Sequence, residues 1–142
     1  MNFLLDTNVI SELRKAKTKK INENVKAWAE SVSPNQLFLS VISLLELEMG
    51  IGLIERRDKP QAALLRVWLN HHVLPTFQER VLPIDTTIAL CCGKLHVPDP
   101  RSDRDALIAA TALVHNMTVV TRNVADFEPT AVKILNPWDF SL

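Results

Sequence analysis

The amino-acid sequence predicts an α/β fold, with a central parallel sheet of four to five strands flanked by helices on both faces. Short β-branched or leucine-rich runs alternate along the chain with longer segments whose apolar residues recur at helical spacing. We find no repeat, low-complexity tract or linker in the 142 residues. A hydrophobic content of 47% suits one stable core, so residues 1–142 are expected to form a single domain.

The N-terminal part begins with an apolar run, Phe3–Leu5, that ends in three small polar residues, as expected of a buried strand. A short helical turn over Val9–Arg14 leads into a basic run, which we interpret as a solvated loop. Apolar residues on one face then predict a helix over Asn22–Val32, which the proline after Ser33 ends. The apolar run Leu37–Leu39 predicts the second strand.

The middle of the chain is predicted to form a helical hairpin beside the sheet. One helix opens at a serine and spans Ser43–Arg57, with leucine and isoleucine residues at helical spacing. A charged turn separates it from a second helix over Pro60–Pro75. The next run, Val81–Asp85, resembles a strand whose internal proline restricts it to the edge of the sheet or marks the end of the strand.

The C-terminal part repeats the alternation of helix and strand. Thr86–Leu95 is expected to be a helix, and the proline-rich Pro98–Ser102 a loop. Asp103–His115 is rich in alanine and leucine, which predicts a well-buried helix. The β-branched run Met117–Thr121 predicts an interior strand, and Val132–Leu135 predicts the last one.

The composition limits the possible partners and the compartment. Sixteen basic residues balance sixteen acidic ones, so any contact with nucleic acid has to come from a local patch. The only cysteines, Cys91 and Cys92, are adjacent, which suits neither an ordinary disulfide nor a spaced zinc motif. No signal sequence or membrane-length apolar run is evident. We therefore expect a cytoplasmic protein without a membrane partner.

Four acidic residues occupy comparable places in this layout. Asp6 directly follows the first strand, and Asp126 follows the strand Met117–Thr121. Glu46 and Asp105 stand early in two of the predicted helices. Because ligand sites of parallel sheets lie at the carboxyl ends of the strands, all four can face one site.

Each acid also has a purely structural explanation, which stays open. Asp6 and Asn8 could simply cap the following helix. A carboxylate in a first helical turn would bond an unpaired amide and complement the helix dipole. The spacing of a capping box is present three times, because three polar residues stand three positions before the other acids: Ser43, Ser102 and Asn123 before Glu46, Asp105 and Asp126.

The two explanations are compatible, since the positive end of a helix favours an ionised carboxylate. Four carboxylates that converge without lysine or arginine partners would repel one another unless a cation lay between them. Mg²⁺ or Mn²⁺ fits that description, and two such ions about 4 Å apart could promote phosphodiester hydrolysis by water. Supporting groups are expected from Thr7, Asn8, Ser43, Thr121 and Asn123.

Four stretches carry a family resemblance: Leu4–Glu12, Leu39–Leu47, Asp105–Ala112 and Val119–Phe127, followed by the ending Asn136–Trp138. In this order and at these separations they resemble PIN-domain ribonucleases, especially VapC-type toxins and the similar FitB-type proteins. The resemblance spans nearly the whole chain and implies a single PIN domain over residues 1–142.

The resemblance also implies a division of roles. Asp6, Glu46 and Asp105 would form the metal-binding core, and Asp126 would complete the catalytic site. Related proteins place the fourth acid either where Asn123 stands or where Asp126 stands, and we favour Asp126 with Asn123 in support. Acids outside the matching positions are excluded from the site: Glu12, Glu48, Asp99 and Asp103.

The function that the resemblance implies is that of a metal-dependent endoribonuclease toxin. Its substrate would be RNA, with transfer RNA as one candidate. A cognate VapB-like antitoxin would neutralise it and would contact operator DNA to repress the operon. The resemblance further implies a homodimer, for which the helices Asn22–Val32 and Ser43–Arg57 are candidate interfaces.

The sequence also allows other functions for the chain and other roles for several residues. A phosphoacceptor-type signalling domain would use Asp6 as the acceptor, but it wants a second acid near the first strand and a lysine after a late strand, for which Arg122 is no substitute. A phosphatase with an aspartyl nucleophile would want a second carboxylate where Asn8 stands. A PIN-like module without activity, acting only in regulation, stays open. Arg122 could contact an RNA phosphate or could pair with a nearby acid. Structural roles are expected for Trp28, Trp68, Trp138, His71 and His72.

Overall fold

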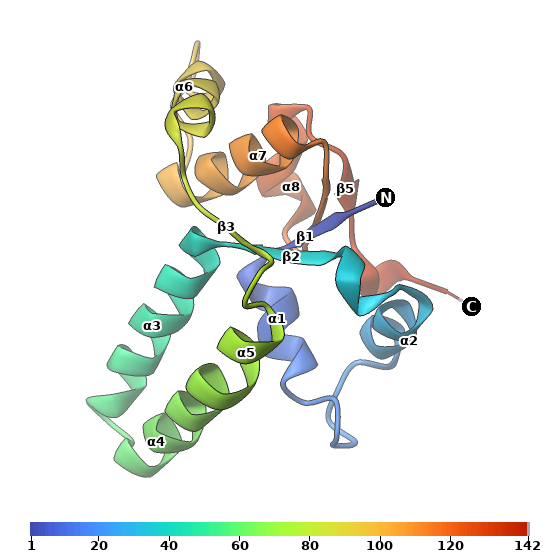
Figure 1. Cartoon of the computed structure of the whole chain (residues 1–142), viewed down its shortest axis with the longest axis vertical. Coiled ribbons are helices and arrows are strands. Elements are labelled where there is room, and N and C mark those ends of the chain that lie inside the picture. The colour runs from blue at the N-terminus through green and yellow to red at the C-terminus, as the bar shows by residue number, and fades with distance from the viewer. Residues whose placement is uncertain (142) are drawn as a thin grey trace.

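Five parallel strands form the centre of the protein, in the order β3-β2-β1-β4-β5 (Figure 1). The computed structural model describes residues 1–141. Leu4, on the central strand, pairs with Phe38 on one side and with Val119 on the other. The strands are β1 Phe3–Leu5, β2 Leu37–Ser40, β3 Val81–Leu82, β4 Thr118–Val120 and β5 Ile134–Leu135. The predicted parallel sheet is confirmed.

Helices follow almost every strand. They are α1 Thr7–Leu13, α2 Glu23–Ser31, α3 Val41–Glu55, α4 Lys59–Trp68, α5 Leu74–Thr76, α6 Thr86–Leu95, α7 Asp103–His115 and α8 Val124–Phe127. A π-helical segment, Leu69–Val73, joins α4 to α5, so the predicted helix Pro60–Pro75 is continuous. Short 3₁₀ turns cover Pro34–Gln36, Glu128–Thr130 and Pro137–Asp139.

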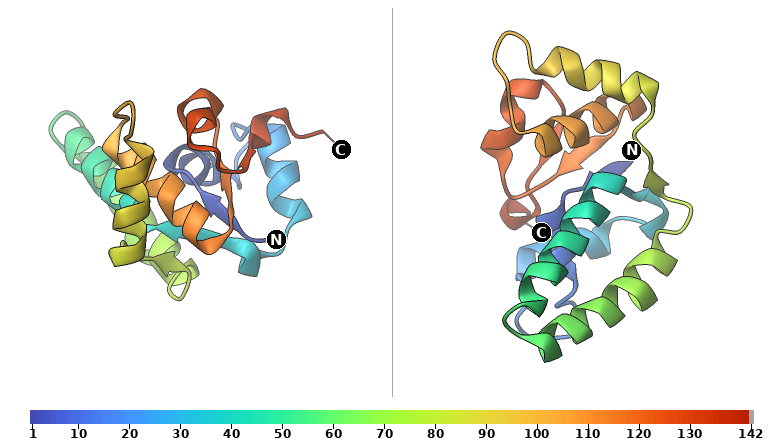
Figure 2. Two further views of the ribbon diagram at one scale, coloured as in Figure 1. Left: turned by 90° about the horizontal axis from the view of Figure 1, so that it is seen from above. Right: turned by 90° about the vertical axis from the view of Figure 1, so that its left-hand side faces the viewer.

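The sheet is covered on both faces, because successive side chains of a strand point to opposite sides. Phe3 and Leu5 of β1 belong to a core cluster with residues of α1, α2, α3 and α4. Leu4, between them, packs instead with residues of α7 and α8. Figure 2 shows the two groups of helices on opposite sides of the sheet. The predicted arrangement of helices on both faces is therefore confirmed.

One predicted helix start is wrong. The helix α3 begins at Val41, directly after β2, and its N-cap is Ser40 rather than Ser43. The hydroxyl of Ser40 accepts a hydrogen bond from the Ile42 N–H at 3.0 Å. Ser43 is the third residue of the helix and is fully buried. Both serines fit the N-cap pattern, and the end of β2 decides between them.

Two other boundaries differ slightly from expectation. The edge strand β3 is shorter than the predicted run Val81–Asp85, because it ends at Leu82, directly before the proline. Both of its residues are half-buried. The last strand β5 pairs only through Ile134 and Leu135 rather than from Val132 onward.

Over residues 1–141 we find no helical stretch with the length and hydropathy that a membrane crossing requires.

Candidate active site

Asp6 lies at the carboxyl end of the central strand, where β1 passes into α1. It is the N-cap of α1, and its Oδ1 accepts a hydrogen bond from the Thr7 N–H at 2.8 Å. Its Oδ2 accepts from the Thr121 hydroxyl at 2.8 Å and from the Asn8 amide at 3.3 Å. With 6% exposure, this carboxylate is buried and held in one orientation. Capping and site formation thus coincide at Asp6.

Polar groups after β4 complete the surroundings of Asp6. Thr121 is fully buried, and its hydroxyl oxygen accepts from the Asn123 N–H at 3.0 Å. The Oδ1 of Asn8 accepts from the Arg122 N–H at 3.2 Å. These bonds fix the segment after β4 against the first turn of α1. Thr7, Asn8, Thr121 and Asn123 therefore lie where supporting residues are expected.

Glu46 reaches the same place from α3. Since α3 begins at Val41, Glu46 stands in its second turn and not in the predicted first turn. Its Oε1 accepts from the Thr7 hydroxyl at 2.8 Å. Its Oε2 lies 3.7 Å from a guanidinium nitrogen of Arg104. The sequence predicted acids without lysine or arginine partners, and this is wrong for Glu46, which has Arg104 as a partner. Arg104 was not singled out from the sequence.

Asp105 and Asp126 stand in the first turns of α7 and α8. The N-cap residues of these helices are Ser102 and Asn123, as predicted, but neither side chain makes a capping hydrogen bond. The capping-box explanation is thus incomplete at both helices. Ser43, the third residue of that pattern, also has no partner for its buried hydroxyl.

The surroundings of Asp6 and Asp105 raise the pKa of both carboxyl groups. Burial, followed by the negative charges of Asp6, Asp126 and Glu46, raises the pKa of Asp105 to about 6, with Arg104 acting in the opposite direction. Burial also raises the pKa of Asp6, while the bonds from Thr121 and Thr7 lower it and the charges of Glu46 and Asp126 raise it further. All four acids therefore share one electrostatic environment.

Three of the four acids that the sequence excluded have partners elsewhere. Glu48 forms a two-pronged pair with Arg66, at 2.7 and 2.5 Å, on the outer side of the helical hairpin. Asp103, with a side chain 91% exposed, lies 3.4 Å from the imidazole of His96. Glu12 accepts from the Asn22 N–H at 2.7 Å. These contacts give the three acids structural roles.

The donor set suits a hard divalent cation, because it consists of carboxylate oxygens with threonine and asparagine groups around them. Within residues 1–141, no group of three or more aspartate, glutamate, histidine or cysteine side chains is already placed so that it could hold a metal ion. Burial and the negative charges of the other three acids raise the pKa of Asp105, and a bound cation would offset both effects. An open cluster of this kind suits an ion that keeps several of its waters.

Arg122 is exposed at the rim of this site. Its guanidinium lies over the ring of Trp138, 5.1 Å from the ring centre, in a cation–π contact. Across the described chain, no carboxylate lies within ion-pair distance of Arg122. The ion-pair alternative for Arg122 is therefore not what the structure shows.

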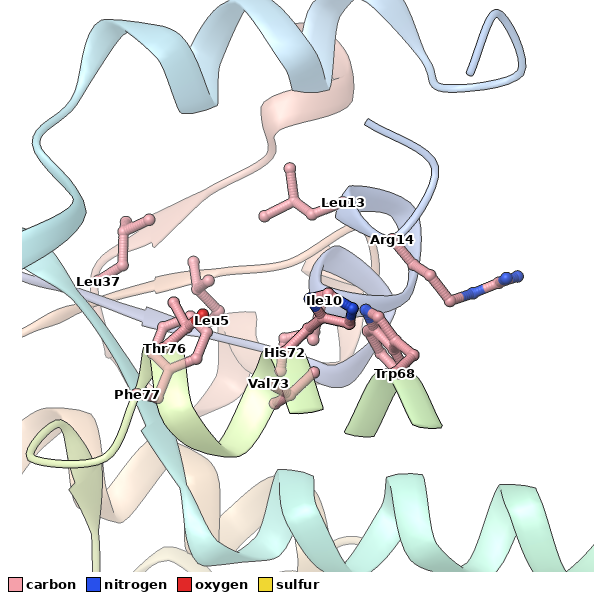
Figure 3. Close-up of a pocket in the computed structure, with 10 residues that line it drawn as sticks. All are labelled: Leu5, Ile10, Leu13, Arg14, Leu37, Trp68, His72, Val73, Thr76 and Phe77. Carbon is pink, nitrogen blue, oxygen red and sulfur yellow. The ribbon is translucent and has the colours of Figure 1, made fainter. Parts of the chain in front are cut away.

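Two largely apolar hollows lie beside the acids. A groove of about 320 Å³ runs from Thr7 and Glu46 between α1 and the hairpin of α3 and α4. A second cavity of about 250 Å³ lies between α1, the sheet and the segment from α4 to α5. Arg14 and Trp68 line both hollows, and Figure 3 shows them at one end of the second cavity, with Leu37 at the other.

Comparison with known proteins identifies the family of this chain. The family model of the PIN domain matches residues 3–132, and the chain therefore belongs to the PIN-domain family. It is similar to the toxin FitB of Neisseria gonorrhoeae, with 35% identity over 141 residues that cover 96% of this chain and 98% of the relative. It is also similar to the VapC ribonuclease Y4jK of Sinorhizobium fredii, with 34% identity over 142 residues, 96% of this chain and 98% of the relative.

Solved structures show the same similarity. A crystal structure of FitAcB from Neisseria gonorrhoeae superimposes with a TM-score of 0.86 at 34% identity, covering 97% of this chain and 99% of the other. A structure of FitAB bound to an IR36 DNA fragment gives a TM-score of 0.84 at 33% identity, covering 99% of this chain and 98% of the other. The predicted PIN fold is confirmed along nearly its whole length.

Proposed function

We propose that this chain is the ribonuclease toxin of a toxin–antitoxin pair and hydrolyses RNA with Mg²⁺ or Mn²⁺ at Asp6, Glu46, Asp105 and Asp126. Relatives that match almost the whole chain are named toxin FitB and VapC ribonuclease. The single observation that carries the proposal is the meeting of acids from separate elements at the carboxyl end of β1, where Thr7 bonds Asp6 through its amide and Glu46 through its hydroxyl. Burial and the charges of the other three acids raise the pKa of Asp105 to about 6, in agreement with this arrangement. A nuclease that needs a divalent cation requires such a concentration of negative charge.

The side chains of this protein have distinct tasks in that reaction. When bound, Mg²⁺ or Mn²⁺ supplies the positive charge that polarises a phosphate oxygen and acidifies a water. Asp6 and Glu46 are held in fixed directions, by the Thr121 and Thr7 hydroxyls respectively. Asp105 and Asp126 come from helix first turns, whose positive potential favours ionised carboxylates. Thr7 joins the two sides, because it bonds Asp6 through its amide and Glu46 through its hydroxyl.

We further propose that a cognate VapB-like antitoxin inhibits this site and contacts operator DNA. Similar chains have been solved as FitAcB and as FitAB bound to DNA. An acidic pocket is a natural receptor for an arginine or lysine of an inhibitor. The apolar groove that begins at Thr7 and Glu46 would hold the rest of the inhibiting segment. In the same proposal the toxin is a homodimer.

The decisive experiment incubates the purified, antitoxin-free protein with total RNA and Mn²⁺ or Mg²⁺. Cleavage is expected, and it should disappear with a chelator and in the variant Asp6→Asn. The matched control is Asp103→Asn, which removes one carboxylate from the exposed side of α7 and should keep activity. Cleavage that persists in chelator and in Asp6→Asn would refute the metal site. A failure to cleave any RNA would favour a PIN-like regulatory module.

A further inference from the structure

A concentrated basic segment follows α1, the helix that begins at Asp6. The segment Arg14–Lys20, which we call the basic loop, connects α1 to α2 and contains five basic residues among seven, with no acidic residue. The whole chain has a formal charge of zero, so this loop is a strong local departure. The side chains of Lys17, Lys19 and Lys20 are exposed. In the part of the chain that the structure describes, none of them forms an ion pair.

The basic loop is an ordered set of turns. The Thr18 N–H donates to the Lys15 carbonyl at 2.8 Å, and the Thr18 hydroxyl donates to the same carbonyl at 2.8 Å. The Lys20 N–H in turn donates to the Thr18 hydroxyl oxygen at 3.1 Å. Ile21, just after the loop, is buried and anchors its end. The lysines therefore project from a defined backbone, which reduces the entropy lost when they bind a ligand.

Contacts connect this loop to Arg122 and hence to the acidic site. Glu12 accepts from the Asn22 N–H at 2.7 Å and pairs with Lys15 at 3.2 Å, so it closes the base of the loop. Burial raises the pKa of Glu12, whereas these two partners and the charge of Arg122 lower it. The amide of Asn24 also donates to the carbonyl of Trp138, on whose ring Arg122 rests.

Arg122 is the basic residue next to the acids, because it directly follows Thr121, whose hydroxyl bonds Asp6. We propose that the basic loop and Arg122 form the surface on which the phosphate backbone of single-stranded RNA lies as it leads into the acidic site. This inference rests on the proposed function and names the part of the protein that holds the substrate.

Electrostatics explains why such a surface is needed. The four carboxylates repel RNA phosphates, and a chain of zero net charge provides no compensating long-range attraction. Lysines act as mobile point charges that suit backbone contacts without sequence preference. The guanidinium of Arg122 lies over the ring of Trp138, and an arginine beside an aromatic ring also suits stacking against an unpaired base. An acidic protein segment would satisfy the lysines but would not account for the continuity with the acidic site.

The test measures binding of a fluorescein-labelled single-stranded RNA by anisotropy, in chelator so that no cleavage occurs, across a series of salt concentrations. The variant Lys17→Ala/Lys19→Ala/Lys20→Ala should bind at least tenfold more weakly than wild type at about 0.1 M salt. Its plot of log affinity against log salt should be shallower by about 2, because each lost contact to a single strand changes the slope by about 0.7. Arg122→Ala should make the slope of the same plot shallower by about 0.7.

The matched control removes the same charge from the turn between α3 and α4, in the variant Arg56→Ala/Arg57→Ala/Lys59→Ala. These residues are exposed, and their turn lies at the far end of the helical hairpin, away from the basic loop (Figure 1). This variant should bind RNA like wild type. Thermal melting confirms that both triple variants are folded.

Each outcome has a definite meaning. Equal losses in the two triple variants, or unchanged binding in the loop variant, would overturn the inference. So would a loop variant that keeps RNA binding and loses only the cognate antitoxin. Metal-dependent cleavage by wild type would still support the proposed function in those cases. Conversely, a selective loss of binding by the loop variant, together with no cleavage by wild type, would support the surface and refute the proposed function.

Discussion

Asp105 is the carboxyl group with the clearest consequence for stability. Burial and the charges of three neighbouring acids raise its pKa from 3.8 to about 6. The folded protein therefore keeps this proton at pH values where the unfolded chain has released it. Stability is highest while Asp105 is protonated and falls as the pH rises from about 4 towards and beyond 6. The raised pKa of Asp6 acts in the same direction.

We predict that Asp105→Asn raises the unfolding free energy of the metal-free protein at pH 7.5 by roughly 1–2 kcal/mol, after allowance for screening of a partly exposed group. The variant should gain little at pH 4, where wild type is already protonated. Urea unfolding at the two pH values measures this difference. Mn²⁺ should raise the melting temperature of wild type and not that of the variant. An equal gain at both pH values would show that repulsion is not its source.

Ser40 and Ser43 make a second test at the scale of single hydroxyl groups. Ser40 caps α3, so Ser40→Ala should lower stability by about 1 kcal/mol. The buried hydroxyl of Ser43 has no partner, so Ser43→Ala should raise stability by about 1 kcal/mol. Chemical unfolding of the two variants compares them directly. A loss in Ser43→Ala as large as that in Ser40→Ala would mean that the Ser43 hydroxyl has a hydrogen-bond partner in solution.

At the scale of elements, the site depends on how α1 is joined to α3. The Thr7 hydroxyl donates to Glu46 across that contact. We predict that Thr7→Val, which keeps the shape and removes the hydroxyl, lowers kcat/KM for RNA cleavage about tenfold or more. Thr7→Ser should stay within about twofold of wild type, because it keeps the donor. If valine and serine variants are equally active, Thr7 does not position Glu46.

The elements themselves could be read largely from the sequence. The helices α6 and α7 have the predicted bounds, because each has a clear polar start and an uninterrupted apolar pattern. The start of α3 was wrong, because two serines three residues apart both fit an N-cap and only the end of β2 distinguishes them. Periodicity reports the covered face of a helix well and reports its ends poorly.

The candidate active site could be predicted from the sequence only in part. Spacing placed Asp6, Glu46, Asp105 and Asp126 at one end of the sheet, and their mutual effects on pKa agree with that. The pairing of Arg104 with Glu46 could not be predicted, because the two residues lie on different helices, α7 and α3, that are far apart in the sequence. Nor could the position of Arg122 on Trp138, which depends on where the C-terminal segment packs.

At the scale of the whole molecule, the two helices named as candidate dimer interfaces differ in what they expose. The apolar residues of α2 turn inward: Val25 and Trp28 are buried, and Trp28 packs edge-on against Phe3 with ring centres 5.4 Å apart. The helix α3 instead leaves Leu45, Met49 and Leu53 exposed, by 45%, 48% and 64%. Their spacing of four residues puts them in one stripe, so α3 is the better candidate.

We therefore predict that wild type sediments as a dimer, with twice the 16.0 kDa mass of the chain, and that Met49→Lys/Leu53→Lys sediments as a monomer. Two buried ammonium groups at a self-complementary interface would face their symmetry mates without a counter-charge, which opposes association. The control Leu64→Lys/Val67→Lys introduces the same charges at residues of α4 that are 67% and 51% exposed. It should remain dimeric. Dissociation of the control alone would transfer the interface to α4, and a monomeric wild type would refute the homodimer itself.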